Sequence, residues 1–146
     1  MPRADYVCAL PIRVRWAEVD MQKIVFNGHY LTYIDTAVAE YWRAIGLSYP
    51  DVYVERYASD LYLRKATLEY LGSARYDDML TVLCRVAKLG RSSMTFRFEI
   101  ARGAEDSPLV TAELVYVNAD TASMKAAPLP EDVRARITRY ERVAPQ

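Results

Sequence analysis

The stretch EVDMQKIVFNGHYLTYIDTAVAEYWRAIG (residues 18–46) decides the fold, because it contains the one long helical pattern of the chain. From residue 30 onward, apolar side chains recur at spacings of three and four, which is the period of an amphipathic helix. The pattern predicts one helix of about five turns. Asn27 is placed to cap its first turn and Gly46 to end it. The apolar face consists of Tyr30, Tyr33, Ile34, Ala37, Val38, Tyr41, Trp42 and Ile45.

Five segments around this helix have the alternation and composition of β-strands. The clearest case is the run in which Met94, Phe96, Phe98 and Ile100 alternate with other residues that would face the opposite side. Such alternation indicates a sheet with one buried face. The expected strands are residues 7–16, 61–71, 79–89, 93–102 and 109–118.

The order of these elements predicts an α+β fold in a single domain over residues 1–146. The connectors GSARYDD, GRSS and GAEDSP are short and rich in turn residues, so consecutive strands are expected to pair antiparallel as a meander. Residues 47–60 are expected to be a connector. Pro130 suits the first position of a short C-terminal surface helix. We therefore expect a five-stranded antiparallel sheet curled around the long helix, plus this short helix.

The composition excludes several classes of function. The 19 Lys and Arg residues balance the 19 Asp and Glu residues, so no net positive charge is available to bind nucleic acid. No segment approaches the roughly 20 apolar residues of a membrane span, and the first residues lack a signal-peptide core. We therefore expect a soluble, cytoplasmic protein. Cys8 and Cys84 belong to no CxxC pattern and His29 is the only histidine, which argues against a disulfide scaffold and against a metal site.

Polar residues gather just before the long helix. Asp20, Asn27, Gly28 and His29 each have an ordinary structural role there, as turn former, cap, flexible link or solvated side chain. Together they also suit acyl-transfer chemistry. The first amides of a helix lack intrahelical acceptors and can stabilise a carbonyl oxygen that becomes negative, while an ionised carboxylate can act as a base or as a nucleophile. Both interpretations are open at this point.

The chain resembles the hotdog-fold acyl-CoA thioesterases of the 4-hydroxybenzoyl-CoA thioesterase type. The resemblance lies in RVRWAEVDMQKIVFNGHYLTYIDTA (residues 13–37), LEYLGSARYDDMLTV (68–82), KLGRSSMTFRFEIAR (88–102) and APLPEDV (127–133). It implies the hotdog fold, in which a curled sheet wraps around one helix. It also implies an acyl-CoA thioesterase that works as a homodimer or homotetramer and needs no cofactor, since coenzyme A is part of the substrate.

The resemblance also implies roles for individual residues. Asp20 matches the catalytic aspartate of the family, which is a nucleophile or a general base. The backbone amide of Asn27 matches the group that polarises the thioester carbonyl. Gly28, His29 and Tyr30 follow at positions expected to contact substrate.

Two basic residues fall near positions where relatives bind the coenzyme A phosphates: Arg91 in the GRSS turn and Lys125 ahead of APLP. A solvated turn charge is the equally weighted alternative for each. The sequence departs from the family at Lys23, where relatives have a loop glycine, and its acid pair consists of Glu18 and Asp20. A hotdog hydratase or dehydratase, and a non-catalytic acyl-CoA or lipid-binding protein, are the alternative functions.

Overall fold

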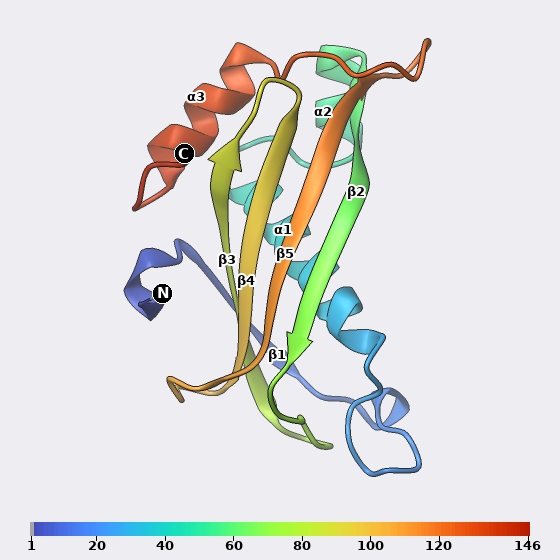
Figure 1. Cartoon of the computed structure of the whole chain (residues 1–146), viewed down its shortest axis with the longest axis vertical. Coiled ribbons are helices and arrows are strands. Elements are labelled where there is room, and N and C mark those ends of the chain that lie inside the picture. The colour runs from blue at the N-terminus through green and yellow to red at the C-terminus, as the bar shows by residue number, and fades with distance from the viewer. Residues whose placement is uncertain (1) are drawn as a thin grey trace.

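Alternating apolar and polar residues build one antiparallel sheet of five strands, in the spatial order β1-β3-β4-β5-β2. The computed structural model describes residues 2–146. Figure 1 shows helix α1 lying against one face of the sheet, with the other face free of helices. The expected α+β architecture is confirmed. The strands are β1 (Cys8–Arg13), β2 (Ser59–Tyr70), β3 (Met79–Leu89), β4 (Ser93–Arg102) and β5 (Pro108–Asp120).

Helix α1 (His29–Ala44) is the predicted long helix, and its apolar face forms the core together with the inner face of the sheet. Ile34, Ala37 and Tyr41 are 0% exposed, as are Phe96 and Leu114 of the facing strands. Burying a large apolar side chain contributes about 1.5–3 kcal/mol, so this contact is the main source of stability. The predicted stripe of the helix is confirmed.

The ends of α1 differ from the prediction in one respect. Gly46 follows the helix with a φ of 78°, in the left-handed region expected of a terminating glycine. The predicted cap at Asn27, however, is wrong. The cap position is Gly28, and no side chain caps the helix, because the His29 N–H donates to the Phe26 carbonyl at 3.0 Å. A backbone turn therefore takes the place expected for the Asn27 side chain.

The meander prediction is correct for β3, β4 and β5 but wrong for β2. Instead of pairing with β3, β2 pairs with β5 at the opposite edge of the sheet. The reason is that β1 already occupies the free side of β3, with Cys8 and Cys84 in register. The connector GSARYDD therefore crosses from the β2 edge to β3, which lies next to the opposite edge strand β1, and is not a hairpin turn. As a result, the sheet ends in a short edge strand, β1, and in a long one, β2.

Residues 47–60 contain a helix that the sequence analysis treated as a connector. Helix α2 (Asp51–Tyr57) follows Pro50, which occupies its cap position. Tyr53 is 0% exposed, and its hydroxyl lies 2.9 Å from the Asn118 amide oxygen of β5. The contact with Asn118 is 65 residues away in sequence, so local pattern alone gave no sign of it.

The first predicted strand is shorter than expected. β1 ends at Arg13, and Trp16–Glu18 form a short 3-10 helix in which Trp16 is 79% exposed. The apparent alternation through Trp16 was therefore misleading. This turn redirects the chain toward the loop that contains Asp20.

The two cysteines are buried and reduced, as expected of small core residues. They are distant in sequence, yet Cys8 and Cys84 are register partners across β1 and β3. Burial raises the pKa of both thiols above the ordinary value. Both side chains therefore favour the neutral form and serve the core.

Helix α3 (Glu131–Tyr140) is the predicted C-terminal helix and closes one end of the molecule, with Val133 and Ile137 buried. Pro130 is its cap residue and not its first helical residue. Glu141 follows it and is only 8% exposed. Its Oε2 atom accepts hydrogen bonds from the Tyr41 hydroxyl at 2.6 Å and from the Val86 N–H at 2.9 Å. Burial raises the pKa of Glu141, although these hydrogen bonds oppose the effect. A carboxyl group thus joins the end of α3 to the core.

Glu141 makes the stability of the fold depend on pH. Because its pKa is higher in the folded chain than in the unfolded chain, it binds more protons when folded. The stabilisation is complete below the unfolded carboxyl pKa and is lost as pH rises through the folded pKa. We expect the free energy of unfolding of the native chain, minus that of Glu141→Gln, to fall as pH rises from 4 to 8, in urea titrations. Glu55→Gln, at an exposed site on α2, is the control. A difference that does not change with pH would contradict this assignment.

Candidate active site

The loop between β1 and α1 folds tightly around Asp20. The Asp20 N–H donates to the Ile24 carbonyl at 3.0 Å, and the Lys23 N–H donates to the Asp20 carbonyl at 2.9 Å. The Gln22 N–H donates to the Asp20 Oδ1 atom at 2.8 Å. Lys23 has a φ of 65°, which lies in the left-handed region. The loop therefore fixes one carboxylate oxygen of Asp20 with its own backbone.

Asp20 lines a cavity of about 380 Å³ at the start of α1. Asn27 and Tyr30 line the same cavity, so the structure brings together three of the residues expected at the site. Tyr70, Gly72 and Ser73 also line the wall and were not among the residues predicted from the sequence. These residues come from the end of β2 and the connector that follows it. They lie within the quoted segment LEYLGSARYDD, whose resemblance to the family was the available signal.

The two residues before α1 present backbone amides near this cavity. Within residues 2–146, neither the Asn27 N–H nor the Gly28 N–H donates a hydrogen bond to a protein acceptor. Both precede a helix of 16 residues, whose dipole places partial positive charge at this end. The Asn27 carbonyl, in contrast, accepts a hydrogen bond from the Tyr70 hydroxyl at 3.2 Å. Tyr70 thus holds the peptide group that contains the Gly28 N–H.

The residues after Asn27 differ in how they meet the cavity. Tyr30 is only 2% exposed, and its hydroxyl accepts a hydrogen bond from the Ala74 N–H at 3.0 Å, so it forms a wall. His29 is half-buried, with its ring 5.8 Å from that of Phe26. Gly28 is exposed, and a Cβ atom there would lie 3.0 Å from the Phe26 ring. Neither Gly28 nor His29 lines the cavity.

The two acids before α1 have separate environments. Glu18 is 5% exposed and accepts hydrogen bonds at 2.8 Å from the Tyr33 hydroxyl and from the backbone and side chain of Arg15. Burial alone would raise the pKa of Glu18, but these hydrogen bonds outweigh it and lower the pKa. Glu18 therefore has a structural role. Asp20 is the acid that reaches the cavity.

The two basic residues expected to bind coenzyme A lie at the other end of the sheet. Figure 1 shows the β3–β4 turn, which contains Arg91, at the top, and the loop before α1 at the bottom. The loop after β5, which contains Lys125, is also at the top, and the Arg91 carbonyl accepts a hydrogen bond from the Leu129 N–H there at 2.9 Å. Both side chains belong to exposed residues. Within one chain, neither approaches Asp20.

A second cavity, of about 260 Å³, lies beside the middle of α1. Its lining is mostly apolar and includes Trp42, Leu61, Phe96 and Tyr116. Asp35 is at its edge, and burial raises the pKa of that carboxyl group. This cavity can hold an apolar group. Asp20 and Asn27 do not line it, so it has neither the Asp20 carboxylate nor the Asn27 amide.

Two further observations concern metals and membranes. Within residues 2–146, no group of three or more His, Cys, Asp or Glu side chains is placed to hold a metal ion. No helix of the described chain combines the length and apolar character needed to cross a bilayer.

Comparison with known proteins gives consistent results. The thioesterase-like superfamily matches residues 14–137. Acyl-CoA thioester hydrolase YbgC of Escherichia coli O6:H1 is 31% identical over 125 residues, which cover 86% of this chain and 91% of the relative.

Solved structures agree on the fold. A thioesterase of Thermus thermophilus, complexed with coenzyme A and Zn, superposes with a TM-score of 0.79 at 26% identity, covering 94% of this chain and 96% of the other. A 1,4-dihydroxy-2-naphthoyl-CoA thioesterase of Synechocystis superposes with a TM-score of 0.81 at 20% identity, covering 89% and 94%. The hotdog fold implied by the sequence resemblance is confirmed. With a family match over most of its length, the chain belongs to the thioesterase-like superfamily.

Proposed function

We propose that this chain is an acyl-CoA thioesterase in which Asp20 and the amide of Asn27 act on the thioester carbonyl. The observation that carries the proposal is that both residues line one cavity, at the start of a buried helix. The similarity to an acyl-CoA thioester hydrolase supports the substrate class. A thioester placed between the carboxylate and the amide would meet a negative oxygen on one side and a donor on the other.

The geometry supports a division of labour between the two groups. An amide without a protein acceptor can hydrogen-bond the carbonyl oxygen and stabilise the negative charge that develops on it. One Asp20 oxygen accepts the Gln22 N–H, which orients the carboxylate and leaves its other oxygen for chemistry. That oxygen can take a proton from a water molecule that attacks the carbonyl carbon. It can also attack the carbon itself, giving an anhydride that water then cleaves. In either route the coenzyme A thiol departs.

The coenzyme is expected to bind across two subunits. β2 is an edge strand of 12 residues, and most of its residues are exposed. A two-fold axis that pairs two such edges would run them antiparallel. This arrangement would bring the end with Arg91 and Lys125 from one subunit toward the Asp20 end of its partner. We therefore propose a homodimer, or a homotetramer built from such dimers, with sites shared between subunits.

Lys23 is held in a conformation that costs free energy. Its φ of 65° is in the left-handed region, where a side chain with a Cβ atom is disfavoured by roughly 1–2 kcal/mol. A glycine, which the family resemblance leads us to expect at this position, would adopt the same conformation without that cost.

The first test is Asp20→Asn. The substitution removes the charge and the basic oxygen while retaining the shape, so we expect thioester hydrolysis to fall by at least about 10²-fold. Thiol release should be measured with aromatic, short-chain and long-chain acyl-CoA esters. Asp106→Asn, at an exposed position in the β4–β5 connector, is the matched control. An Asp20→Asn protein that is folded, by circular dichroism, and turns over as fast as the native chain would exclude Asp20 from the mechanism.

The second test concerns the loop. Lys23→Gly relieves the left-handed strain, and we expect it to stabilise the chain by about 1 kcal/mol in urea unfolding. Gln22→Gly is the control, since residue 22 is not in the left-handed region and glycine there should destabilise by about 0.5–1 kcal/mol. Equal effects of the two substitutions would show that the backbone conformation of residue 23 carries no cost.

The third test is the oligomeric state. Sedimentation velocity at micromolar concentration should give a particle of at least two chains, because the β2 edge has no partner within one chain. A monomer that hydrolyses acyl-CoA at this concentration would disprove shared sites.

A further inference from the structure

The connector of residues 72–78 contacts both the Asp20 loop and helix α1. Gly72 and Ser73 line the cavity. The Ala74 carbonyl accepts a hydrogen bond at 2.9 Å from the Val25 N–H, at the end of the Asp20 loop, and its N–H donates at 3.0 Å to the Tyr30 hydroxyl. A single residue, Ala74, therefore joins the loop that contains the carboxylate to the first turn of α1, which directly follows the amides of Asn27 and Gly28.

The far end of this connector holds the chain that leads into the Asp20 loop. The Val14 N–H donates to the Asp78 carbonyl at 2.9 Å, and the Asp77 N–H donates to the Val14 carbonyl at 3.2 Å. The connector is thus bonded both before the loop, at Val14, and after it, at Val25. Movement of the connector would move both ends of the Asp20 loop.

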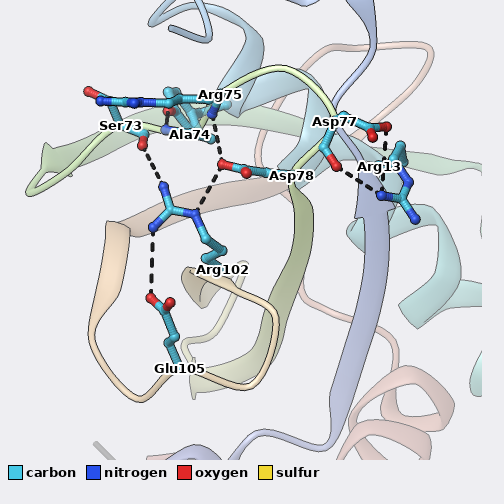
Figure 2. A network of polar contacts seen from close by, with 9 residues as sticks. Arg13, Ser73, Ala74, Arg75, Asp77, Asp78, Arg102 and Glu105 are labelled. Carbon is cyan, nitrogen blue, oxygen red and sulfur yellow. Dashed lines mark hydrogen bonds and ion pairs between the residues drawn. The ribbon is translucent and has the colours of Figure 1, made fainter.

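Arg102, at the end of β4, holds the connector in place, as Figure 2 shows. Its Nε atom lies 3.0 Å from the Asp78 Oδ2 atom, and its Nη2 atom donates to the Ser73 carbonyl at 2.9 Å. The same Asp78 oxygen accepts the Arg75 N–H at 2.9 Å. The remaining nitrogen of Arg102, Nη1, lies 3.8 Å from the Glu105 Oε2 atom. One planar guanidinium group thereby connects both ends of the connector with β4.

The geometry of this contact requires arginine. Guanidinium presents several donors in a fixed plane, whereas a lysine ammonium is a single point charge. A lysine at residue 102 could pair with Asp78 but could not also hold the Ser73 carbonyl in the same orientation. Arg97 lies on β4, as Arg102 does, and pairs with Glu113 of β5. This pair differs from the Arg102 contacts. It is a single contact of 3.4 Å with about half of each side chain exposed, and it touches no part of residues 72–78.

We infer that Arg102 is a positioning residue for hydrolysis: through Ser73, Asp78 and Ala74 it sets the separation between the Asp20 carboxylate and the amides at the start of α1. The inference rests on the proposed function for its kinetic consequence. Arg102 does not touch the cavity itself, so its effect should fall on the rate of the chemical step and much less on binding.

The kinetic test compares Arg102→Lys, Arg102→Met and Asp78→Asn with the control Arg97→Met. A displacement of about 1 Å can lower a rate about 10²-fold, so we expect kcat to fall between tenfold and 10²-fold in Arg102→Met and less in Arg102→Lys, with KM changed less than threefold. Assays should be run well below the midpoint of thermal unfolding of each variant. Arg97→Met should match the native chain. Folded Arg102→Met and Asp78→Asn proteins with native kcat would overturn the inference, whatever their stability.

A second measurement is independent of activity. Because the Val25 amide bonds to the connector, its hydrogen exchange should accelerate at least tenfold in Arg102→Met relative to the native chain and to Arg97→Met. If the native chain hydrolyses no acyl-CoA ester, the proposed function fails, and this exchange rate still tests the positioning. An unchanged Val25 exchange rate would show that Arg102 does not hold the loop.

Discussion

The burial of α1 against the inner face of the sheet is the constraint on which the rest of the structure depends. Six of the 16 residues of this helix are buried, and the most central have no exposed surface. A helix held this firmly along one face cannot slide or rotate without opening cavities. Its first turn is therefore fixed in space, together with the amides of Asn27 and Gly28. The position of the site therefore depends on the packing of α1 against the sheet.

The Asp20 loop is fixed by a different kind of force. Few of its side chains are buried, so backbone hydrogen bonds set its shape, from Asp20 to Ile24 and from Val25 to Ala74. Glu18 adds an anchor just before the loop through its buried contacts with Arg15 and Tyr33. The two acids of this segment thus divide into one that holds the chain and one that faces the cavity. A loop of this kind can tolerate the strained backbone of Lys23 because its neighbours determine the path.

The sequence was most informative where periodicity is strong. The stripe along α1, the alternation in β4 and the terminating role of Gly46 depend on nearby residues, and the structure agrees with each. It failed where the deciding partner is distant. Helix α2 is anchored through Tyr53 by a residue of β5, and β2 pairs with β5 because β1 fills the free side of β3. The cap predicted at Asn27 failed for a local reason, because a backbone turn from His29 to Phe26 takes its place. Within the site, Asp20 and Asn27 came from local pattern and resemblance. The supporting residues Tyr70 and Ala74 come from the end of β2 and from the connector that crosses from β2 to β3, and no local pattern predicts where such a crossing lies.

If Arg91 and Lys125 bind the coenzyme, as proposed above, one chain alone cannot complete the site. The carboxylate and the helix amides occupy one end of the sheet, while Arg91 and Lys125 occupy the other. α1 alone spans about 24 Å, at a rise of about 1.5 Å for each residue, which is longer than a flexible basic side chain can bridge. A ligand with a thioester at one end and phosphates at the other would need an end with Asp20 close to an end with Arg91 and Lys125. An antiparallel arrangement of two chains meets this requirement without any change in the fold, because it places unlike ends side by side. The exposed length of β2 provides the edge along which such a pair can form.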